Sequence, residues 1–491
     1  MRQHLSNAGW SGFAAAFRAA YGLLNVLLAI RLLGAEPYGH FATLLAAFVF
    51  YASIGTSMFT MLVVKLMAAG PDAREKHALL VSGWIWTGCS LLMLTAVCLV
   101  AWLLALGGML PAGWGVSSEN FDLLCILSLL AAMQISGAFQ LAVMESIGRL
   151  DLAIKTQLFG PVAVLALLLT ALFSGIEMSA RAYAAALCAG AAIDLAMAWA
   201  FRRRLVSVTF GSFVWGDVAS RLRQLLGSGS LLQATLLMNM FLEPFNKMLL
   251  NSLLGGGAVT VYDLSMKMIW GILSLFSAAT RVFLHLSTQD RGLVESSYLN
   301  AVRLFCVPAL LLHVVACLFL VVLGYYWLAL DTRQLALFFG VATLSNMGMI
   351  AVTPLYNSLI GAEEMRFIFK TQVTLAVTNV IASLCLIPLL GVIGAAVGLL
   401  LATAYNAAAI LRKSRAVTGN SSLAGHLLRS LQPRLVVVGI LFSLAVYCGL
   451  DAKAAALLEP AILFVVLAMA LREPVAAYLF SAIMQRAFPR R

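Results

Sequence analysis

Two pairs of opposite charges lie inside long apolar stretches of the sequence, where a charged side chain is costly to place. Glu243 precedes Lys247 by four residues, and Asp263 precedes Lys267 by four. On a helix each pair would share one face, with the acid on the favourable N-terminal side. Two interpretations follow. Each pair neutralises itself, or the carboxylates bind a coupling ion and the ammonium groups bind an anionic substrate.

Arg18 differs because it lies about ten residues into the first apolar stretch, near mid-bilayer at about 1.5 Å per residue. None of its neighbours three or four positions away is acidic. It must therefore find an anion elsewhere. One partner would be a carboxylate on another helix, such as Glu243 or Asp194. The other would be a pyrophosphate, whose oxygens suit a guanidinium fork.

Uncharged polar residues in the apolar stretches are candidates to line a sugar path, although such residues also hydrogen-bond between helices. We select Asn25, Asn239 and Asn246 as substrate-binding candidates. Asp194 joins Glu243 and Asp263 as a candidate for ion coupling. His313 lies deep in a span, and a lone buried histidine is more often a packing residue.

No signature of catalysis accompanies these residues. HExxH, GxSxG, P-loop and DxD patterns do not occur, and the eight cysteines show no CxxC or Cys/His spacing. The sequence therefore predicts no catalytic residue, metal site or cofactor. A transport cycle without an ATP site would need a proton or sodium gradient.

The elements that position these residues are membrane helices. Of the 491 residues, 62% are hydrophobic and 11% are charged, whereas a soluble domain is roughly 25% charged. Apolar runs of about 20 residues recur, and they are continuous rather than alternating, which excludes a β-barrel. We predict an all-α polytopic membrane protein with about 14 transmembrane helices. The segments are 8–34, 41–67, 78–105, 121–147, 152–174, 180–201, 228–254, 258–285, 303–330, 334–360, 366–389, 391–411, 434–451 and 453–472.

The basic residues indicate an orientation. With 14 spans and cytoplasmic termini, 25 of the 32 Lys and Arg residues fall on the cytoplasmic side and four on the opposite side. Such a bias follows the positive-inside rule, so the net charge of +12 needs no nucleic-acid partner. The two longer cytoplasmic connections, 202–227 and 412–433, mix basic and apolar residues and are predicted to form short amphipathic segments.

The chain also repeats weakly within itself. LLGAEPYGHF at 32–41 is similar to LLGGGAVTVY at 253–262, and KTQ occurs at both 155–157 and 370–372. Later glycine turns, Gly175-Ile176 and Gly391-Val392, keep nearly the same offset. These echoes place the first six helices over the next six as parallel repeats, with a substrate site between them. The predicted division is an N-lobe at 1–205, a C-lobe at 206–411 and a C-terminal part at 412–491.

Three motifs carry a resemblance to a known family. They are AIRLLGAEPYGHF at 29–41, the spaced elements NKMLL, LG and VTVY within 246–262, and IPLLGVIGAAVG at 387–398. In this order they resemble polysaccharide-export flippases (Wzx-like) of the multidrug/oligosaccharidyl-lipid/polysaccharide exporter superfamily, over about residues 5–411. Asn246 stands where an acidic residue is usual, and Thr260 where glycine is usual.

The resemblance implies an inner-membrane protein of bacteria that moves an undecaprenyl-pyrophosphate-linked oligosaccharide outward by alternating access. It would serve O-antigen or exopolysaccharide biosynthesis, among membrane lipids and other polysaccharide-assembly proteins. Arg18, Lys247 and Lys267 would hold the pyrophosphate. A drug/cation antiporter of the same fold and a membrane-embedded glycan polymerase or ligase are the alternatives. The excess of deep cations disfavours the antiporter, and the short outer loops disfavour the membrane enzyme.

Overall fold

The structure is a computed structural model that describes residues 2–68, 73–107, 121–147, 149–205, 215–228, 230–280, 291–362 and 364–418. The described residues are helical, as predicted, and no strand occurs among them. The helices are α1 (Arg2–Leu33), α2 (Ala35–Ala68), α3 (Ala73–Leu106), α4 (Phe121–Ser146), α5 (Leu150–Phe173), α6 (Ala180–Leu205), α7 (Trp215–Ser228), α8 (Ser230–Leu254), α9 (Gly256–Thr280), α11 (Arg291–Leu323), the π-helical turn η3 (Gly324–Leu328), α12 (Thr332–Gly361), α13 (Met365–Leu390) and α14 (Val392–Thr418).

Twelve long helices occupy the first twelve predicted spans. Among the described residues, eleven helices are long and apolar enough to cross a membrane, and together they make the chain a multi-pass membrane protein. Helix α8 is long enough but is not among the eleven, because it carries several polar side chains whose partners are described below. The predicted spans 434–451 and 453–472 lie outside the described residues.

Several helices end at a glycine, and the internal echoes pair these glycines with one another. Gly34 and Gly255 have φ of 87° and 85°, and Gly175 and Gly391 have φ of 65° and 64°. This left-handed conformation costs glycine little and is common just after a helix. Two of the three echoes in the sequence therefore correspond to the same backbone turn, which explains why the glycine recurs in them.

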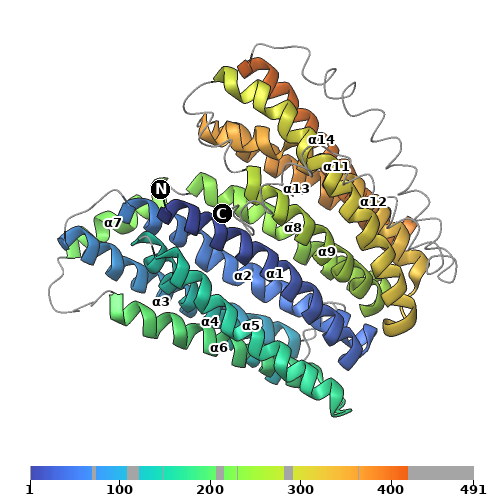
Figure 1. The fold of residues 1–491 in the computed structure, drawn as a ribbon. Coiled ribbons are helices and arrows are strands. Elements are labelled where there is room, and N and C mark those ends of the chain that lie inside the picture. Colours follow the sequence, from blue (N-terminus) through green and yellow to red (C-terminus); the bar gives the residue numbers. More distant parts are fainter. Residues whose placement is uncertain are drawn as a thin grey trace, which may run out of the picture. The chain divides into compact units, whose positions relative to one another are not determined.

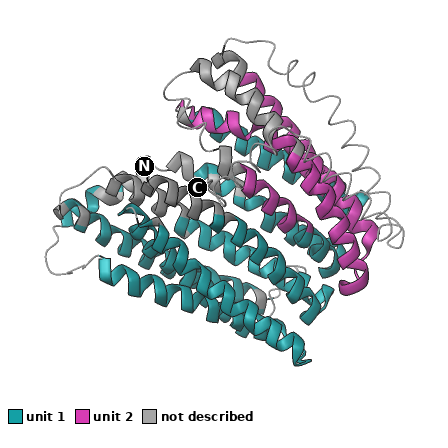
Figure 2. Cartoon of the chain, viewed as in Figure 1, with its two compact units in different colours: residues 1–264, 365–395 teal, residues 265–364, 396–491 magenta. Residues whose placement is uncertain are grey.

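The chain divides into two compact units, coloured separately in Figure 2. Unit 1 comprises residues 1–264 and 365–395, and unit 2 comprises 265–364 and 396–491. Within unit 1, α1 to α6 run side by side (Figure 1), with α2 against α4 and α8, and α6 against both α4 and α5. Within unit 2, α11 lies against α12. These units do not coincide with the predicted lobes, which remain a prediction.

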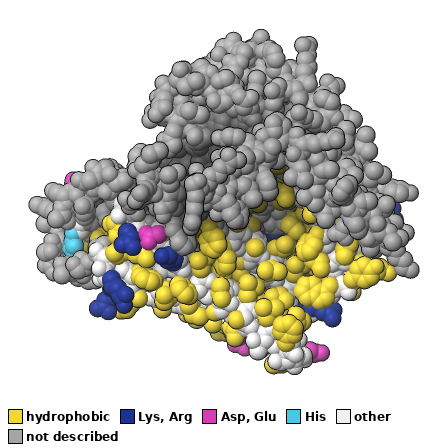
Figure 3. Space-filling model, in the orientation of Figure 1, with side chains coloured by type: hydrophobic (Ala, Val, Ile, Leu, Met, Phe, Trp, Pro, Cys, Tyr) yellow, Lys and Arg dark blue, Asp and Glu magenta, His cyan; other side chains and the backbone are white. Residues whose placement is uncertain are grey.

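The surface of the described residues suits a lipid environment. Hydrophobic side chains cover most of the described face in Figure 3, and charged side chains lie toward its edges. On helix α3, for example, the exposed fractions of Leu92, Met93, Val97 and Val100 are 45–73%. A soluble protein rarely exposes such a continuous apolar face.

Helix α7 lies in the predicted amphipathic connection 202–227. Val218 is fully buried with Ala78 and Val81 of α3, whereas Trp215 is 66% exposed. The prediction of an amphipathic segment is therefore confirmed for α7. Of the second such connection, the structure describes only the end of α14, as far as Thr418.

Candidate functional site

The first echo pair forms a direct contact between the α1–α2 turn and the α8–α9 turn. Both carboxylate oxygens of Glu36 accept backbone N–H groups at the start of α9, from Gly256 at 2.7 Å and from Gly257 at 2.5 Å. Free N–H groups at a helix N-terminus attract an anion, so Glu36 caps α9 from another helix. We call the contact between residues 35–39 and 256–260 the clasp.

The clasp brings two backbones unusually close. A Cβ added at Gly39 would lie 1.8 Å from the carbonyl oxygen of Gly256, so only glycine fits. Thr260 donates its hydroxyl to the carbonyl oxygen of Ala35, in addition to the carbonyl oxygen of Gly256 in its own helix. The hydroxyl of Thr260 therefore adds a hydrogen bond to the contact.

A buried charged cluster lies next to the clasp. Lys247 Nζ is 2.6 Å from Glu243 Oε1 and 2.6 Å from Asp263 Oδ1. Tyr38 of α2 donates its hydroxyl to Asp263 Oδ2 at 2.5 Å. Lys247 and Asp263 are 3% and 1% exposed. Helices α2, α8 and α9 thus meet through one hydrogen-bonded network.

The cluster confirms one predicted pairing and adds a contact that the sequence spacing did not indicate. Glu243 pairs with Lys247 within α8, as the spacing of four indicated. The spacing of four also offered a pair between Asp263 and Lys267 in α9, which stays a prediction; the structure adds contacts of Asp263 with Lys247 of α8 and with Tyr38. Packing decides this, because the buried face of α9 points Asp263 at α8. Two carboxylates thus share one ammonium group, an arrangement in which a proton or a cation could bind.

Asn246 links α8 to two other helices of unit 1. Its Oδ1 accepts from Asn379 Nδ2 of α13 at 3.2 Å, and its own Nδ2 donates to the Tyr262 hydroxyl at 3.4 Å. All three side chains are buried, by 98% or more. In this structure Asn246 joins helices, and its predicted contact with substrate remains a prediction.

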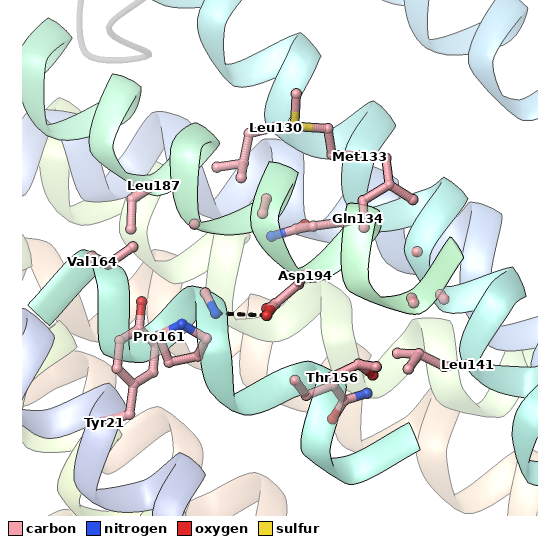
Figure 4. A pocket seen from close by; sticks show the side chains of 18 of the residues that line it. Tyr21, Leu130, Met133, Gln134, Leu141, Thr156, Pro161, Val164, Leu187 and Asp194 are labelled. Carbon is pink, nitrogen blue, oxygen red and sulfur yellow. Dashed lines mark hydrogen bonds between the residues drawn. The ribbon is translucent and has the colours of Figure 1, made fainter. Parts of the chain in front are cut away.

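Two other predicted residues, Asn25 and Asp194, line one cavity of about 360 Å³ among α1, α2, α4, α5 and α6 (Figure 4). Asp194 Oδ1 accepts the backbone N–H of Gly160 at 2.7 Å, the bond dashed in Figure 4. Pro161 follows at once, within α5. Among the described residues, Asp194 forms no ion pair. We call this space the Asp194 cavity.

The remaining polar lining of the Asp194 cavity is uncharged. Asn25 Nδ2 donates to the Tyr183 hydroxyl at 2.8 Å, and Asn25 Oδ1 is buried without a hydrogen-bond partner. The described lining contains no Lys or Arg. A cavity with one carboxylate and neutral oxygens suits a cation or a proton, not an anion. The other polar side chains that line it are Tyr21, Gln134, Thr156 and Gln157.

Arg18 makes one described hydrogen bond, from Nε to the carbonyl oxygen of Ala14 at 3.2 Å. Its side chain is exposed, and it forms no ion pair with a described residue. The salt bridges to Glu243 or Asp194 that the sequence allowed are not formed. Arg18 is therefore a cation without a carboxylate partner in the described part of the chain.

His313, in unit 2, has the packing role expected of a lone buried histidine. Its Nδ1 lies 2.6 Å from the carbonyl oxygen of Ala309, and its Nε2 lies 2.9 Å from Asn346 Nδ2. A neutral ring satisfies both contacts, donating from Nδ1 and accepting at Nε2. Lys267 is exposed, also in unit 2, and Asn239 lies in α8 with a side chain outside the described set.

Sequence reasoning missed several residues of these sites. Glu36 and Tyr38 appeared only as letters of a motif, and Gly160 was not selected. The signal for Glu36 and Tyr38 was present in the echo of 32–41 over 253–262, because both segments turn at a glycine. The sequence did not indicate that the two echoes contact each other.

The fold is similar to solved transporter structures. It superposes on a lipid II flippase, MurJ, in an inward closed conformation with a TM-score of 0.69 and 14% identity, covering 95% of this chain and 99% of that one. A Vibrio cholerae MATE transporter, VcmN, gives 0.54 at 14% identity over 86% and 98%. An inward-facing multidrug MATE transporter of the MOP superfamily gives 0.53, also at 14%, over 84% and 95%.

These likenesses place the chain in the fold of MurJ and the MATE transporters. No protein-family model matches the sequence, and none of the curated proteins matches it. At 14% identity the comparison concerns the fold, and the site residues described above supply the basis for a functional argument.

Proposed function

We propose that this protein is a flippase that moves an undecaprenyl-pyrophosphate-linked oligosaccharide across the bacterial inner membrane. The observation that carries the proposal is Arg18, an exposed cation within a membrane span that forms no ion pair with a described residue; the fold that the chain shares with a lipid II flippase supports the same class of protein. The three motifs at 29–41, 246–262 and 387–398 support the same cargo class. Both termini would be cytoplasmic, and the substrates would reach the outer leaflet for O-antigen or exopolysaccharide assembly.

Arg18 is the residue we assign to the pyrophosphate. It is a cation within a membrane span, exposed, and without a carboxylate partner among the described residues. An unpaired arginine in lipid is expensive, so an anionic headgroup is a favourable partner. Lys247 would join it only after Glu243 and Asp263 release its ammonium group. Lys267, Asn25, Asn239 and Asn246 remain candidates for the sugar path.

The clasp supports alternating access. Under the orientation set by the basic residues, the Gly34 and Gly255 turns face the outer side. The clasp would then close the protein on its outer side. Opening of the clasp would remove the Glu36 cap from α9. Because the clasp joins the two predicted repeats, its release would separate them at that end.

The coupling ion would act at the predicted carboxylates. The cluster of Glu243, Lys247 and Asp263 places two carboxylates around one ammonium group beside the clasp. Asp194 provides a second, separate carboxylate in its own cavity. A proton or sodium ion at either carboxylate would neutralise that charge and change its hydrogen bonds.

The test uses proteoliposomes and a dye-labelled undecaprenyl-pyrophosphate N-acetylglucosamine as the probe. We expect Arg18→Ala to lower translocation at least tenfold and Arg18→Lys to retain part of it. Arg333→Ala, at an exposed arginine of α12, is the matched control and should transport normally. Wild-type rates in an Arg18→Ala protein that inserts normally would remove Arg18 from the mechanism.

A drug or cation antiporter is the second candidate, and the Asp194 cavity is the observation that favours it. An acidic cavity without cations suits a cationic drug, and two MATE transporters share the fold. Efflux of ethidium by cells that express the protein, lost in Asp194→Asn, would support this function instead.

A further inference from the structure

Arg202, in the last turn of α6, is a buried cation for which the described residues provide no anion. Its side chain belongs to a residue only 7% exposed, and it forms no ion pair with a described residue. The Nε of Arg202 is buried without a hydrogen-bond partner. Burying a charged group without a partner is costly, and buried charges in proteins are normally paired. Arg202 therefore needs an acceptor from outside the described part of the chain.

A second buried donor without a partner lies beside Arg202. Arg202 Cζ is 5.8 Å from the centre of the Trp84 ring in α3, and Trp84 Nε1 is also buried without a hydrogen-bond partner. The ring of Phe139 in α4 packs against the Trp84 ring, with the two centroids 5.3 Å apart. We call Arg202 and Trp84 together the Arg202 site. Both unsatisfied groups are N–H donors and one is charged, so the missing partner is an anion with several acceptor oxygens.

The helix dipole accounts for the neighbouring arginines but not for the unsatisfied Nε of Arg202. Carbonyl groups at a helix C-terminus attract cations, and Arg203 and Arg204 share the last turn of α6. Both are exposed, and the Arg203 guanidinium also lies over the Trp199 ring at 4.5 Å. Water and the dipole therefore suffice for these two. The dipole favours the charge of Arg202 as well, but it supplies no acceptor to a buried N–H group.

The Arg202 site lies near the surface of the membrane. Arg202 is three residues, or about 4.5 Å, from the end of the candidate span Ala180–Leu205. Trp199 and Trp215 nearby along the chain are 44% and 66% exposed, and tryptophan is typical of the membrane–water interface. Ser82 of α3 donates to a backbone carbonyl of the amphipathic helix α7 at 3.3 Å. The site is therefore at the depth where lipid headgroups supply phosphate oxygens.

The charges around the site favour a headgroup with a net negative charge. Arg202, Arg203 and Arg204 are consecutive, and none of them forms an ion pair with a described residue. A zwitterionic headgroup would bring its own ammonium group close to these cations, whereas an anionic headgroup would not. Basic pockets between spans on the cytoplasmic side are a common way to bind anionic lipids. The orientation indicated by the basic residues places this end of α6 on that side.

We propose that the Arg202 site binds the phosphate group of an anionic phospholipid in the cytoplasmic leaflet. The Arg202 guanidinium binds phosphate oxygens through its fork of N–H groups, and Trp84 Nε1 donates to the same group. Helices α3 and α6 each pack against α4, and the bound headgroup joins their cytoplasmic ends. The site is independent of the cargo, because it serves a flippase and an antiporter equally.

The experiment measures lipid retained by the purified full chain in detergent, using native mass spectrometry and an equimolar mixture of phosphatidylglycerol and phosphatidylcholine. The wild-type protein should retain phosphatidylglycerol in preference. Arg202→Gln should weaken this binding by about tenfold or more, as expected when charge-assisted hydrogen bonds are lost. Trp84→Phe keeps an aromatic ring and removes only the N–H donor, so it should weaken binding several-fold. This second variant decides the question if Arg202→Gln does not fold.

Arg204→Gln is the matched control, because it removes the same charge from an exposed position in the same turn of α6. It should change phosphatidylglycerol binding little, since salt screens exposed charges. Equal losses in Arg202→Gln and Arg204→Gln would overturn the proposal and leave only a diffuse attraction to the basic end of the helix. Undiminished binding in Arg202→Gln and Trp84→Phe would overturn it as well.

Inorganic phosphate distinguishes a lipid from a free anion at the same site. We expect an excess of inorganic phosphate to leave phosphatidylglycerol bound, because the acyl chains hold the lipid at this depth. Phosphatidylglycerol should also raise the melting temperature of the wild-type protein, since a ligand of the folded state stabilises it, and should not raise that of Arg202→Gln. Displacement of the lipid by inorganic phosphate would assign the site to free phosphate and overturn the proposal.

Discussion

At the scale of single residues, Lys247 decides whether the charged cluster is stable. It is buried and shared between Glu243 and Asp263. Breaking a buried ion pair by removing one partner leaves an uncompensated charge, which typically costs about 3–5 kcal/mol. We expect Lys247→Met to lower the melting temperature in detergent by several degrees.

The control for this prediction removes the charge that Lys247→Met would leave behind. Adding Asp263→Asn should restore part of the melting temperature, because one carboxylate fewer remains unpaired. An unchanged melting temperature in Lys247→Met together with lost transport would instead make Lys247 a substrate-binding residue, as the sequence first suggested.

Asp194 carries a separate prediction. It is a carboxylate within a membrane span, and it forms no ion pair with a described residue. If a proton or cation binds there, Asp194→Asn should keep the fold and lose the response of transport to an imposed gradient. Transport by proteoliposomes, measured with and without a pH or sodium gradient, checks this. If transport by Asp194→Asn still responded to the gradient, Glu243 and Asp263 would be the remaining candidates for ion coupling.

At the scale of elements, the clasp depends on the absence of side chains at two turns. Gly39→Ala would place a Cβ against the Gly256 carbonyl oxygen and push α2 from α9. We expect it to favour the unclasped state. Spin labels at Leu33→Cys and Leu254→Cys would then report a longer distance. Gly22→Ala, in open space on α1, is the control and should not change the distance.

The helices were the most predictable part of the structure, because apolar length fixes a membrane span. The twelve predicted spans between 8 and 411 each contain a helix, and α7 lies in the connection predicted to be amphipathic. Helix α8 shows where this reasoning ends. Its polar residues depress its hydropathy, and only the contacts with α2, α9 and α13 explain how they are accommodated.

The site was less predictable, because contacts between distant segments leave little trace in one sequence. The spacing of Glu243 and Lys247 indicated their pairing, since i and i+4 share a helix face. The spacing of Asp263 and Lys267 did not indicate that Asp263 would also contact Lys247, because that contact comes from the packing of α9 against α8. Tyr38, 225 residues from Asp263, had no local signal at all.

At the scale of the whole molecule, the orientation comes from the basic residues and has its own test. Both termini should be cytoplasmic, and the turns at Gly34 and Gly255 should face outward. Single cysteines in a cysteine-free background at the exposed positions 37 and 254, beside these turns, should react with a membrane-impermeant maleimide added to intact cells. A cysteine at 203 should react only after the cells are opened. The reverse pattern would invert the proposed direction of transport.

The central claim is that the cargo is an anionic, lipid-linked sugar. The most direct measurement compares two cargoes in the same reconstituted wild-type protein, with protein-free liposomes as the baseline. We predict that dye-labelled undecaprenyl-pyrophosphate N-acetylglucosamine crosses at least tenfold faster than in the baseline, and that ethidium does not. Accelerated movement of ethidium with no acceleration of the lipid-linked sugar would contradict the account.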